Sequence, residues 1–575
     1  MHQGSFFLVF SNFVLRKLSC KSIDNQCLSI YFCVSKRRMP TLKIDHKDGE
    51  KYVRIIESYR DEAGKTRIRT LVNLGKLTDK KIASLKRLGK KLYQVAGGDL
   101  DEITGKGVAE LERYNYGYVL VCKRVLCHYG LDKLFERIQK KAKLQFSLVN
   151  VVSLMLCERL HDPVSKRRTF FNQEEYLGLQ PAALQHLYRS LDRLADLKEP
   201  IQERIYNTGR NLFNQKLDVV FYDVTTFYFE SEQEIEGTLR QKGFSKDGKI
   251  GNTQVLMGLL IDKNKQPVAY QVYKGDLYEG HTFKDALEAL KKRYQLDQII
   301  VVADRGMLSK ANILELTGNR GYQYILGERL KTLPQHIQQP LLELKNYHKE
   351  WVMNEQENII VKYAMVEYEG RRIIGTWSAT RAQKDRSERQ ERVDKAELIV
   401  KNPSLLKKKA AHYFLKNDKK ENYQIDQEKI ERSEKYDGFL AIATNVREID
   451  TAVILDHYKH LYQVEHAFRT FKSYLETRPM FHWTDQRIEG HLCLCYIAYT
   501  IQIFIQNQLK KNNTPLTEDH VRTTMDRMQL SLIQQGNQQY YLRSKQNQNT
   551  ANLLQSLAIK PLPDFICKEQ IIKYL

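Results

Sequence analysis

The stretch YKHLYQVEHAFRTFK, residues 458–472, places a single acidic side chain on a basic, amphipathic helix. At 3.6 residues per turn, its apolar residues fall along one stripe and its polar residues along the next. An i,i+4 ion pair between Glu465 and Arg469 is the commoner meaning of such spacing. The apolar stripe comprises Leu461, Val464, Phe468, Phe471 and Leu475, and the polar stripe comprises Tyr458, Glu465, Arg469 and Lys472.

Two upstream segments, LDVVFYDVTTFYF and DQIIVVADRGM, are apolar, β-prone runs with a carboxylate at or near the end. These carboxylates are Asp223 and Asp304. A carboxylate in a buried strand is costly to ionise unless it is paired or binds a cation. Taken singly, Asp223 could be a turn residue bonded to the Thr225 and Thr226 hydroxyls, and Asp304 could pair with Arg305. Two strand-end aspartates together with a helical glutamate weaken these explanations.

Three carboxylates drawn to one place would repel one another, and divalent cations relieve that repulsion. An all-oxygen ligand set suits Mg²⁺ or Mn²⁺. The pattern therefore predicts a two-metal phosphoryl-transfer centre held by Asp223, Asp304 and Glu465. One ion would activate a water or a 3′-hydroxyl, and the other would stabilise the leaving oxygen. No base with a tuned pKa is required.

The combined motifs resemble the catalytic DDE triad of bacterial insertion-sequence transposases. Tyr458, Glu465 and Lys472 have the spacing of the Tyr-x2-Arg-x3-Glu-x6-Lys signature of insertion-sequence group four and its close relatives. The resemblance implies that Asp223, Asp304 and Glu465 are the catalytic and metal-binding residues. The other segments that resemble this group are residues 54–76, 436–445 and 478–492.

The resemblance also implies which residues bind DNA phosphates. Tyr458 and Lys472 match the signature and should bind phosphates near the carboxylates. The signature arginine corresponds to Leu461, which cannot carry that charge. Either a neighbour such as Arg469 supplies the charge or this branch manages without it. Arg305 is a further candidate for this role.

The fold implied by the resemblance is a ribonuclease-H-like α/β catalytic core interrupted by a β-rich insertion, with an N-terminal β-hairpin unit and a helical DNA-binding region. The interval from Asp304 to Glu465 is too long for a simple return to the same sheet, so we expect a separate insertion there. Trp351 or Trp377 of the insertion could stack on a flipped base, but core packing is the expected role of both. The expected divisions are residues 1–38, a non-native or disordered extension; 39–78, the β-hairpin unit; 79–210, the helical DNA-binding region; 211–328, the first part of the core; 329–436, the insertion; 437–512, the second part of the core; and 513–575, a C-terminal segment.

The charge of the chain agrees with a nucleic-acid partner. Lys and Arg number 92 against 69 Asp and Glu, giving a net charge of +23. Such a surplus suits a long polyanion. Individual basic runs are usually solvated faces, so only the total charge combined with the carboxylates argues for DNA. The nine cysteines lack CxxC pairs and a disulfide framework, which favours reduced thiols in a cytosol.

The segment HLCLCYIAYTIQIFIQNQLKK, residues 491–511, is apolar enough to mimic a membrane span. Polar residues interrupt it too often, so a buried helix that covers the catalytic sheet is expected. Near the N-terminus, FFLVFSNFVL is too short to cross a bilayer, and no lysine or arginine precedes it. We expect a cytoplasmic protein that associates with the nucleoid when bound to DNA.

The function implied is that of a DNA transposase. It would cleave DNA at the inverted-repeat ends of its element with divalent metal and transfer the 3′-hydroxyl into double-stranded target DNA, as a homodimer. A catalytically silent transposase-derived DNA-binding protein and a stand-alone ribonuclease-H-fold nuclease are the alternatives. The intact set Asp223, Asp304 and Glu465 counts against the silent protein.

Overall fold

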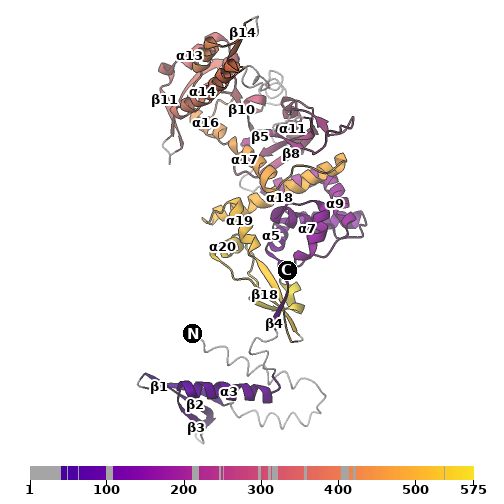
Figure 1. Ribbon diagram of the computed structural model, residues 1–575, viewed down its shortest axis with the longest axis vertical. Helices are drawn as coiled ribbons and strands as arrows, with labels where there is room; N and C mark the ends of the chain where they lie inside the picture. The colour runs from indigo at the N-terminus through magenta and orange to yellow at the C-terminus, as the bar shows by residue number, and fades with distance from the viewer. Residues whose placement is uncertain are drawn as a thin grey trace. The chain divides into compact units, whose positions relative to one another are not determined.

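The computed structural model describes residues 40–575 except for short internal segments, and shows a mixed α/β protein (Figure 1). The chain forms two compact units, residues 1–108 with 535–537, and residues 109–534 with 538–575. The extension predicted over residues 1–38 lies outside the described residues. The internal residues left out are 48, 62–63, 99–107, 210–218, 245–247, 250, 295–298, 308–312, 314–321, 355–358, 403–412, 419–421 and 537.

The first unit contains the predicted hairpin and one strand more. Strands β1 (Thr41–Lys47), β2 (Glu50–Arg60) and β3 (Thr66–Lys76) form an antiparallel sheet in the order β1-β2-β3. Gly64 has φ +77° in the β2–β3 turn, a conformation that L side chains rarely adopt. The hairpin prediction is therefore confirmed. Helix α3 (Asp79–Val95) follows the sheet.

The region that follows is mainly helical, as predicted. The polar faces of its helices carry the expected outward arginines, Arg167, Arg168, Arg189 and Arg193, while leucines such as Leu187 and Leu194 are buried. Its elements are β4 (Val108–Asn115), α5 (Gly117–His128), α6 (Leu131–Lys141), α7 (Leu148–His161), α8 (Lys166–Asn172), α9 (Leu184–Asp196) and α10 (Lys198–Gly209).

A large central sheet holds both predicted aspartate strands. Strand β7 is antiparallel to β5 and β8, whereas β9 is parallel to both β5 and β10. Helix α11 (Glu279–Tyr294) connects β8 to β9, so the predicted order of strand, hairpin, helix and strand is confirmed. These strands are β5 (Val219–Tyr228), β7 (Thr253–Ile261), β8 (Pro267–Lys274), β9 (Ile300–Ala303) and β10 (Gln323–Glu328).

The strands between Asp304 and Glu465 extend this same sheet, so the prediction of a separate insertion is wrong on that point. Strand β16 pairs with β10 on one side and with β13 on the other, and the order continues through β12 to β11. Alternating sequence predicted these strands but not the sheet that they join. They are β11 (Lys349–Asn354), β12 (Ile359–Tyr368), β13 (Arg371–Trp377) and β16 (Phe439–Thr444).

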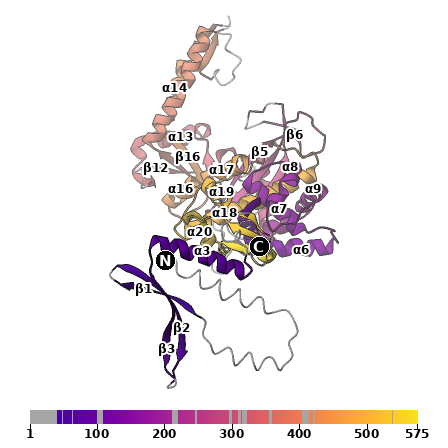
Figure 2. The same cartoon turned by 60° about the horizontal axis from the view of Figure 1, so that its bottom comes forward.

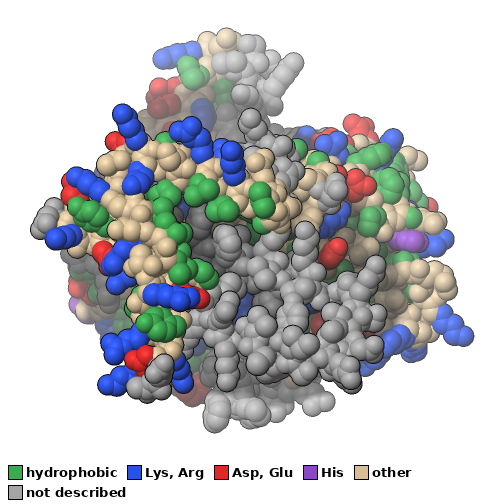
Figure 3. Space-filling view, turned by 90° about the horizontal axis from the view of Figure 1, so that it is seen from below, with side chains coloured by type: hydrophobic (Ala, Val, Ile, Leu, Met, Phe, Trp, Pro, Cys, Tyr) green, Lys and Arg blue, Asp and Glu red, His purple; other side chains and the backbone are tan. Residues whose placement is uncertain are grey.

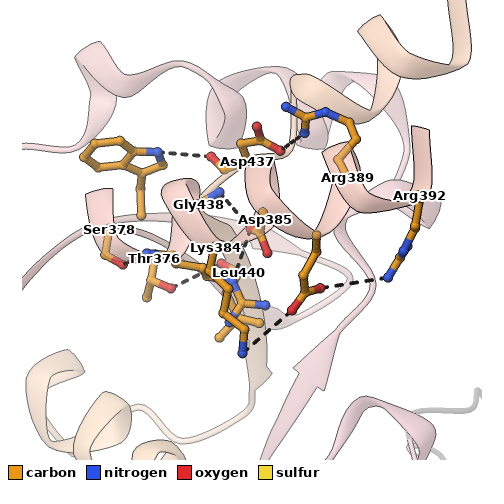
Figure 4. A network of polar contacts seen from close by, with 12 residues as sticks. Thr376, Ser378, Lys384, Asp385, Arg389, Arg392, Asp437, Gly438 and Leu440 are labelled. Atoms are coloured by element: carbon orange, nitrogen blue, oxygen red, sulfur yellow. Dashed lines mark hydrogen bonds and ion pairs between the residues drawn. The ribbon is translucent and has the colours of Figure 1, made fainter. Parts of the chain in front are cut away.

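Helix α14 (Ala379–Lys401) extends away from the sheet (Figure 2). Its outer part forms a small core with β14 (Leu415–Asp418), β15 (Asn422–Ile425) and α15 (Gln427–Glu434). Its first turns are fixed to the loop before β16 by an Arg389–Asp437 ion pair and by the Gly438 N–H, which donates to Asp385 at 3.0 Å (Figure 4).

Of the two tryptophans of this region, only Trp351 shows the expected packing against a hydrophobic core of the described residues. The indole N–H of Trp377 donates to the carbonyl of Asp437 at 3.2 Å. Trp351 packs, partly buried, against the main hydrophobic core.

The 458–472 stretch is amphipathic but is not one continuous helix. It spans the end of α16 (Thr451–Lys459), α17 (Tyr462–Arg469) and a π-helix, η7 (Thr470–Tyr474). The break arises because the Leu461 N–H bonds back three residues to Tyr458. Val464 and Phe468 are buried while Glu465 is exposed, so the predicted two-sided character is confirmed.

Helix α18 (Asp485–Lys511) lies between β8 and helices α7 and α9 (Figure 1). It is long and apolar enough to span a membrane, but 94% of its apolar window is buried inside the protein. The predicted buried helix is therefore confirmed. Gly490 permits close packing here, because a Cβ would collide with the Leu191 backbone of α9. Cys493 and Cys495 are buried in α18, and the six cysteines in the described part of the chain are free.

The C-terminal segment, which the sequence left unassigned, is ordered into a second sheet. Strands β19, β18, β17 and β4 follow one another in that order. The segment contains α19 (Glu518–Asp526), β17 (Gln529–Gln535), β18 (Gln538–Arg543), α20 (Gln548–Ser556) and β19 (Phe565–Cys567).

Candidate active site

Asp223 lies on the face of the central sheet that α17 covers. Successive side chains of a strand point to opposite faces. On β5, Phe221 and Phe227 belong to the core that contains Val464 of α17, whereas Tyr222 belongs to the core on the other face. Asp223 shares the parity of Phe221 and Phe227 and therefore faces α17.

Asp304 continues the same face on the neighbouring strand. In β9, Ile300 and Val302 contribute to the α17-side core, and Asp304 follows at the next position of that parity. Tyr222 of β5 is in register with Ala303 of β9. The next residues, Asp223 and Asp304, are thus neighbours on strands about 5 Å apart.

Gly327 of β10 extends this row to a third strand. Leu326 is in register with Ala303, so Gly327 lies beside Asp304. A Cβ at Gly327 would be 2.5 Å from the Tyr458 hydroxyl oxygen and 2.8 Å from the Arg305 backbone nitrogen. Because Gly327 has no side chain, Tyr458 of α16 can lie over β10.

The side chain of Tyr458 is affected by acids from two elements, Asp304 at the end of β9 and Glu465 on α17. Burial raises the pKa of Tyr458, and the carboxylates of Asp304 and Glu465 raise it further because a phenolate would be repelled there. Arg305 and Arg381 act in the opposite direction. The Tyr458 hydroxyl therefore feels the charges of two predicted acids, Asp304 and Glu465, and of two arginines.

The local alternatives for the acids are not what the structure shows. Glu465 is exposed on α17, whose buried residues pack against β5. Within the described part of the chain, no ion pair joins Glu465 to Arg469 or Asp304 to Arg305. Asp223 Oδ1 accepts the Val224 N–H at 2.7 Å, and the buried Thr226 hydroxyl has no partner among the described residues.

The donor set fits a hard divalent cation by its chemistry, because all three side chains offer carboxylate oxygens. As the side chains stand, however, no three Asp, Glu, His or Cys residues in the described ranges form a group that could hold a metal ion. Asp223 and Asp304 are adjacent on the sheet, and Glu465 approaches from the covering helix. The three carboxylates would have to move closer together to share an ion.

Residues 214–501, half of the chain, match the family model described as Transposase DDE domain. The chain belongs to the DDE transposase family. Residues 42–102 match the IS1634 family transposase, N-terminal domain. No curated protein matches this transposase. The insertion-sequence DDE transposase expected from the motifs is thus confirmed, whereas its placement in group four is not.

The basic side chains near the acids of the transposase lie in different surroundings. Arg469 is exposed at the end of α17, and together with burial and Lys265 it lowers the pKa of His466. Lys472 is half-buried in the π-helix. Arg381, in the first turn of α14, acts on Tyr458 instead. Sequence reasoning missed Arg381 because nothing distinguishes it from the many charges of its helix.

A separate hollow of about 490 Å³ lies in the helical region of the transposase. The Phe146 and His186 rings stack at 4.4 Å between centroids on its wall. Its basic lining suits a phosphate backbone. The residues that line it are Lys143, Leu144, Gln145, Phe146, His186, Arg189, Asp192, Arg193 and Gln486.

Proposed function

We propose that this transposase cleaves DNA at the inverted-repeat ends of its element and joins the freed 3′-hydroxyl to target DNA in a cut-and-paste reaction. The observation that carries the proposal is that Asp223 and Asp304 each follow directly after the paired residues Tyr222 and Ala303 of two parallel strands. Glu465 is exposed on α17, the helix that packs on the same face of the central sheet.

The strand order supports a ribonuclease-H-like core. An antiparallel β5-β7-β8 unit is followed, after α11, by β9 and β10 in parallel with β5. We assign the core to residues 211–328 and 437–512, with residues 329–436 as an extension of its sheet. Residues 39–78 form the hairpin unit, and residues 513–575 pack as a C-terminal segment.

Asp223, Asp304 and Glu465 would hold Mg²⁺ or Mn²⁺, two ions by the chemistry of the reaction. When bound, the ions activate the attacking oxygen and stabilise the leaving one. The task of the chain is to bring the three carboxylates together and to leave their oxygens accessible to the ions. The exposure of Asp304 and Glu465 serves that task.

Tyr458, Lys472, Arg305 and Arg469 bind the DNA phosphates in this proposal. Arg381 supplies the charge that the signature arginine would bring at Leu461. Its effect on the pKa of Tyr458 supports this assignment, because the guanidinium charge acts on the signature tyrosine. A planar guanidinium suits phosphate recognition.

The helical region, residues 79–210, binds the double-stranded transposon ends in a homodimer. The outward arginines of α8 and α9 and the basic hollow support this role. On the face that Figure 3 shows, the Lys and Arg side chains lie at separate places rather than in one patch. Such a distribution suits a protein that contacts a long stretch of DNA. The transposase would act in the cytoplasm, on nucleoid DNA.

The test uses the full-length protein and DNA that carries the inverted repeats flanking the gene. Reactions contain Mg²⁺, Mn²⁺ or EDTA, and gels resolve end cleavage from strand transfer. Metal-dependent cleavage followed by joining supports the proposal. Cleavage without joining favours the nuclease, and binding without cleavage favours the silent DNA-binding protein. Light scattering of the DNA complex measures the number of subunits.

Two matched variants complete this experiment. Glu465→Gln should abolish both steps while leaving end binding intact in a mobility-shift assay. Glu476→Gln removes the same charge from another exposed glutamate and should leave both steps unchanged. Cutting by the Glu465 variant at the rate of the unmodified protein would overturn the assignment.

A further inference from the structure

Arg240 is a buried guanidinium held between two aromatic rings. Its Cζ lies 4.3 Å from the ring centroid of Phe229 and 4.3 Å from that of Trp483. The residue is 1% exposed, its Nη2 donates to Thr253 Oγ1 at 3.3 Å, and its Nε has no partner among the described residues. Burial lowers the pKa of Arg240, and no described carboxylate pairs with it. The two rings are what stabilise this charge.

Trp483 covers Arg240 with one face and is nonetheless 54% exposed. Since the guanidinium hides the inner face, the exposure belongs to the outer face and the ring edge. Phe481, two residues earlier, is 67% exposed. Between them His482 turns inward, 5.0 Å from the His491 ring centroid, and burial lowers its pKa to about 3. The loop thus directs two aromatic rings outward and one neutral ring inward.

The loop that carries Trp483 is held on both sides. The Met480 N–H donates to the Tyr228 carbonyl of β5 at 3.0 Å. After the tryptophan, the Asp485 carboxylate accepts the Leu239 N–H at 3.1 Å, next to Arg240. The stack is therefore ordered before any ligand arrives, which lowers the entropic cost of binding.

Cations lie close to this stack. Arg478 and Lys249 lie over the Tyr228 ring, 5.7 Å and 5.1 Å from its centroid, and Tyr228 precedes Phe229 in the chain. Lys249 also pairs with Glu230 at 3.4 Å. Exposed aromatic rings interleaved with cations are typical of surfaces that bind single-stranded nucleic acid.

We propose that the outer face of Trp483 is a stacking platform for an unpaired nucleobase of the DNA bound by the transposase. The base would complete a stack that runs from Phe229 through Arg240 and Trp483. The proposal rests on the proposed function, because it adds a contact to the same DNA.

Two arguments select an unpaired base as the occupant. Inside a duplex, both faces of a base are covered by its neighbours, so only an unpaired or extruded base can offer a face to a side chain. Phe229 is six residues beyond Asp223, roughly 20 Å along an extended strand. That distance corresponds to about six nucleotides of one DNA strand, so the platform lies near the expected cleavage position.

The experiment compares two DNAs that end in the inverted repeat, one fully paired and one with a single unpaired 2-aminopurine within the last ten positions. The proteins are full-length Trp483→Ala and Trp483→Phe variants. Phe565→Ala, at a 50% exposed aromatic residue of β19, is the matched control. Fluorescence anisotropy gives the Kd, 2-aminopurine emission reports stacking, and circular dichroism checks the fold.

We expect Trp483→Ala to weaken binding of the unpaired DNA about tenfold, the effect of losing one base stack, and to abolish the quenching of 2-aminopurine. Binding of paired DNA should not change, Trp483→Phe should keep most of the affinity, and Phe565→Ala should match the unmodified protein. Unchanged affinity of Trp483→Ala for the unpaired DNA, or equal losses on both DNAs, would overturn the platform. Failure of the unmodified protein to bind either DNA would instead overturn the proposed function and the platform with it.

Discussion

Two groups of charged side chains in this transposase differ in their access to solvent. In the acidic row, two members are exposed and Asp223 is half-buried. In the buried basic cluster, three members are at most 5% exposed and His482 is half-buried. The acidic row consists of Asp223, Asp304 and Glu465, and the buried basic cluster consists of Arg159, Lys166, His482 and His491.

Burial favours the neutral forms of Lys166, His482 and His491 in the buried basic cluster. Lys166 is 4% exposed, and burial followed by the nearby Arg159 lowers its pKa to about 7. Burial also lowers the pKa values of His482 and His491, so both rings are neutral near pH 7. Arg159 donates to the Leu475 carbonyl at 3.1 Å. The comparison indicates that buried charges here serve packing, whereas the exposed acids remain available to a ligand.

The largest expected effect follows from neutralising the acidic row. Asp223→Asn, Asp304→Asn and Glu465→Gln should each lower the rate of end cleavage about 1000-fold or more, because developing charge loses its stabilisation. The free energy of unfolding should change by less than about 1 kcal/mol, since these side chains are not in the core. Cleavage assays and thermal melts measure the two quantities. A large loss of stability without a loss of cleavage would assign the acidic row to structure.

The next effect is on stability and concerns the buried basic cluster. Lys166→Met should raise the free energy of unfolding by roughly 2 kcal/mol at pH 7 or below, because it removes a buried charge that no described carboxylate pairs. The folded protein binds this proton less tightly than the unfolded chain. The gain should therefore be complete below pH 7 and shrink as the pH rises from about 7 toward the ordinary 10.5.

Denaturant unfolding at several pH values measures this difference. Lys198→Met is the matched control, because Lys198 is also buried but has a partner in Glu489 at 3.6 Å. That substitution should lower stability. A stability gain from Lys166→Met that did not depend on pH would show that packing, not charge, is the cause.

A smaller effect distinguishes two arginines beside the acidic row. Arg381→Ala should lower the rate of end cleavage about thirtyfold, the size of one charge-assisted phosphate contact. Arg469→Ala should lower it about twofold, because the charge of Arg469 acts on the pKa of His466 and is not among the charges that shift the pKa of Tyr458. Single-turnover cleavage of matched DNA measures both variants. The reverse order would make Arg469 the substitute for the signature arginine.

The smallest effect concerns the Tyr458 hydroxyl. Tyr458→Phe should lower cleavage about fivefold, since it removes one neutral hydrogen-bonding group and keeps the ring. Gly327→Ala should have a larger effect than Tyr458→Phe, because its Cβ would displace both Tyr458 and the Arg305 backbone. The two variants are compared in the same cleavage assay. An equal effect would show that the position of the ring does not matter.

Much of the central sheet could be predicted because its strands carry strong local patterns. The apolar runs around Asp223 and Asp304, the β7–β8 hairpin and the buried helix α18 all follow from periodicity and turn residues. Their order along the chain then limits how they can pair.

Other features depend on contacts that no local pattern encodes. Alternation in β12 and β13 does not reveal that β16 joins them to β10. The break after Tyr458 occurs without proline or glycine, and Arg381 reaches Tyr458 only through the fold. The second sheet was missed because strands such as QLSLIQQ contain too few apolar residues to stand out.

The position of β16 limits how far this transposase could be shortened. Its hydrogen bonds cover one edge of β10, the neighbour of the strand that leads to Asp304. A variant without residues 329–445 would leave that edge open, and open edges recruit strands from other molecules. Such a truncated protein should self-associate. Residues 329–445 therefore also protect the transposase against aggregation, because they include the strand that pairs with β10.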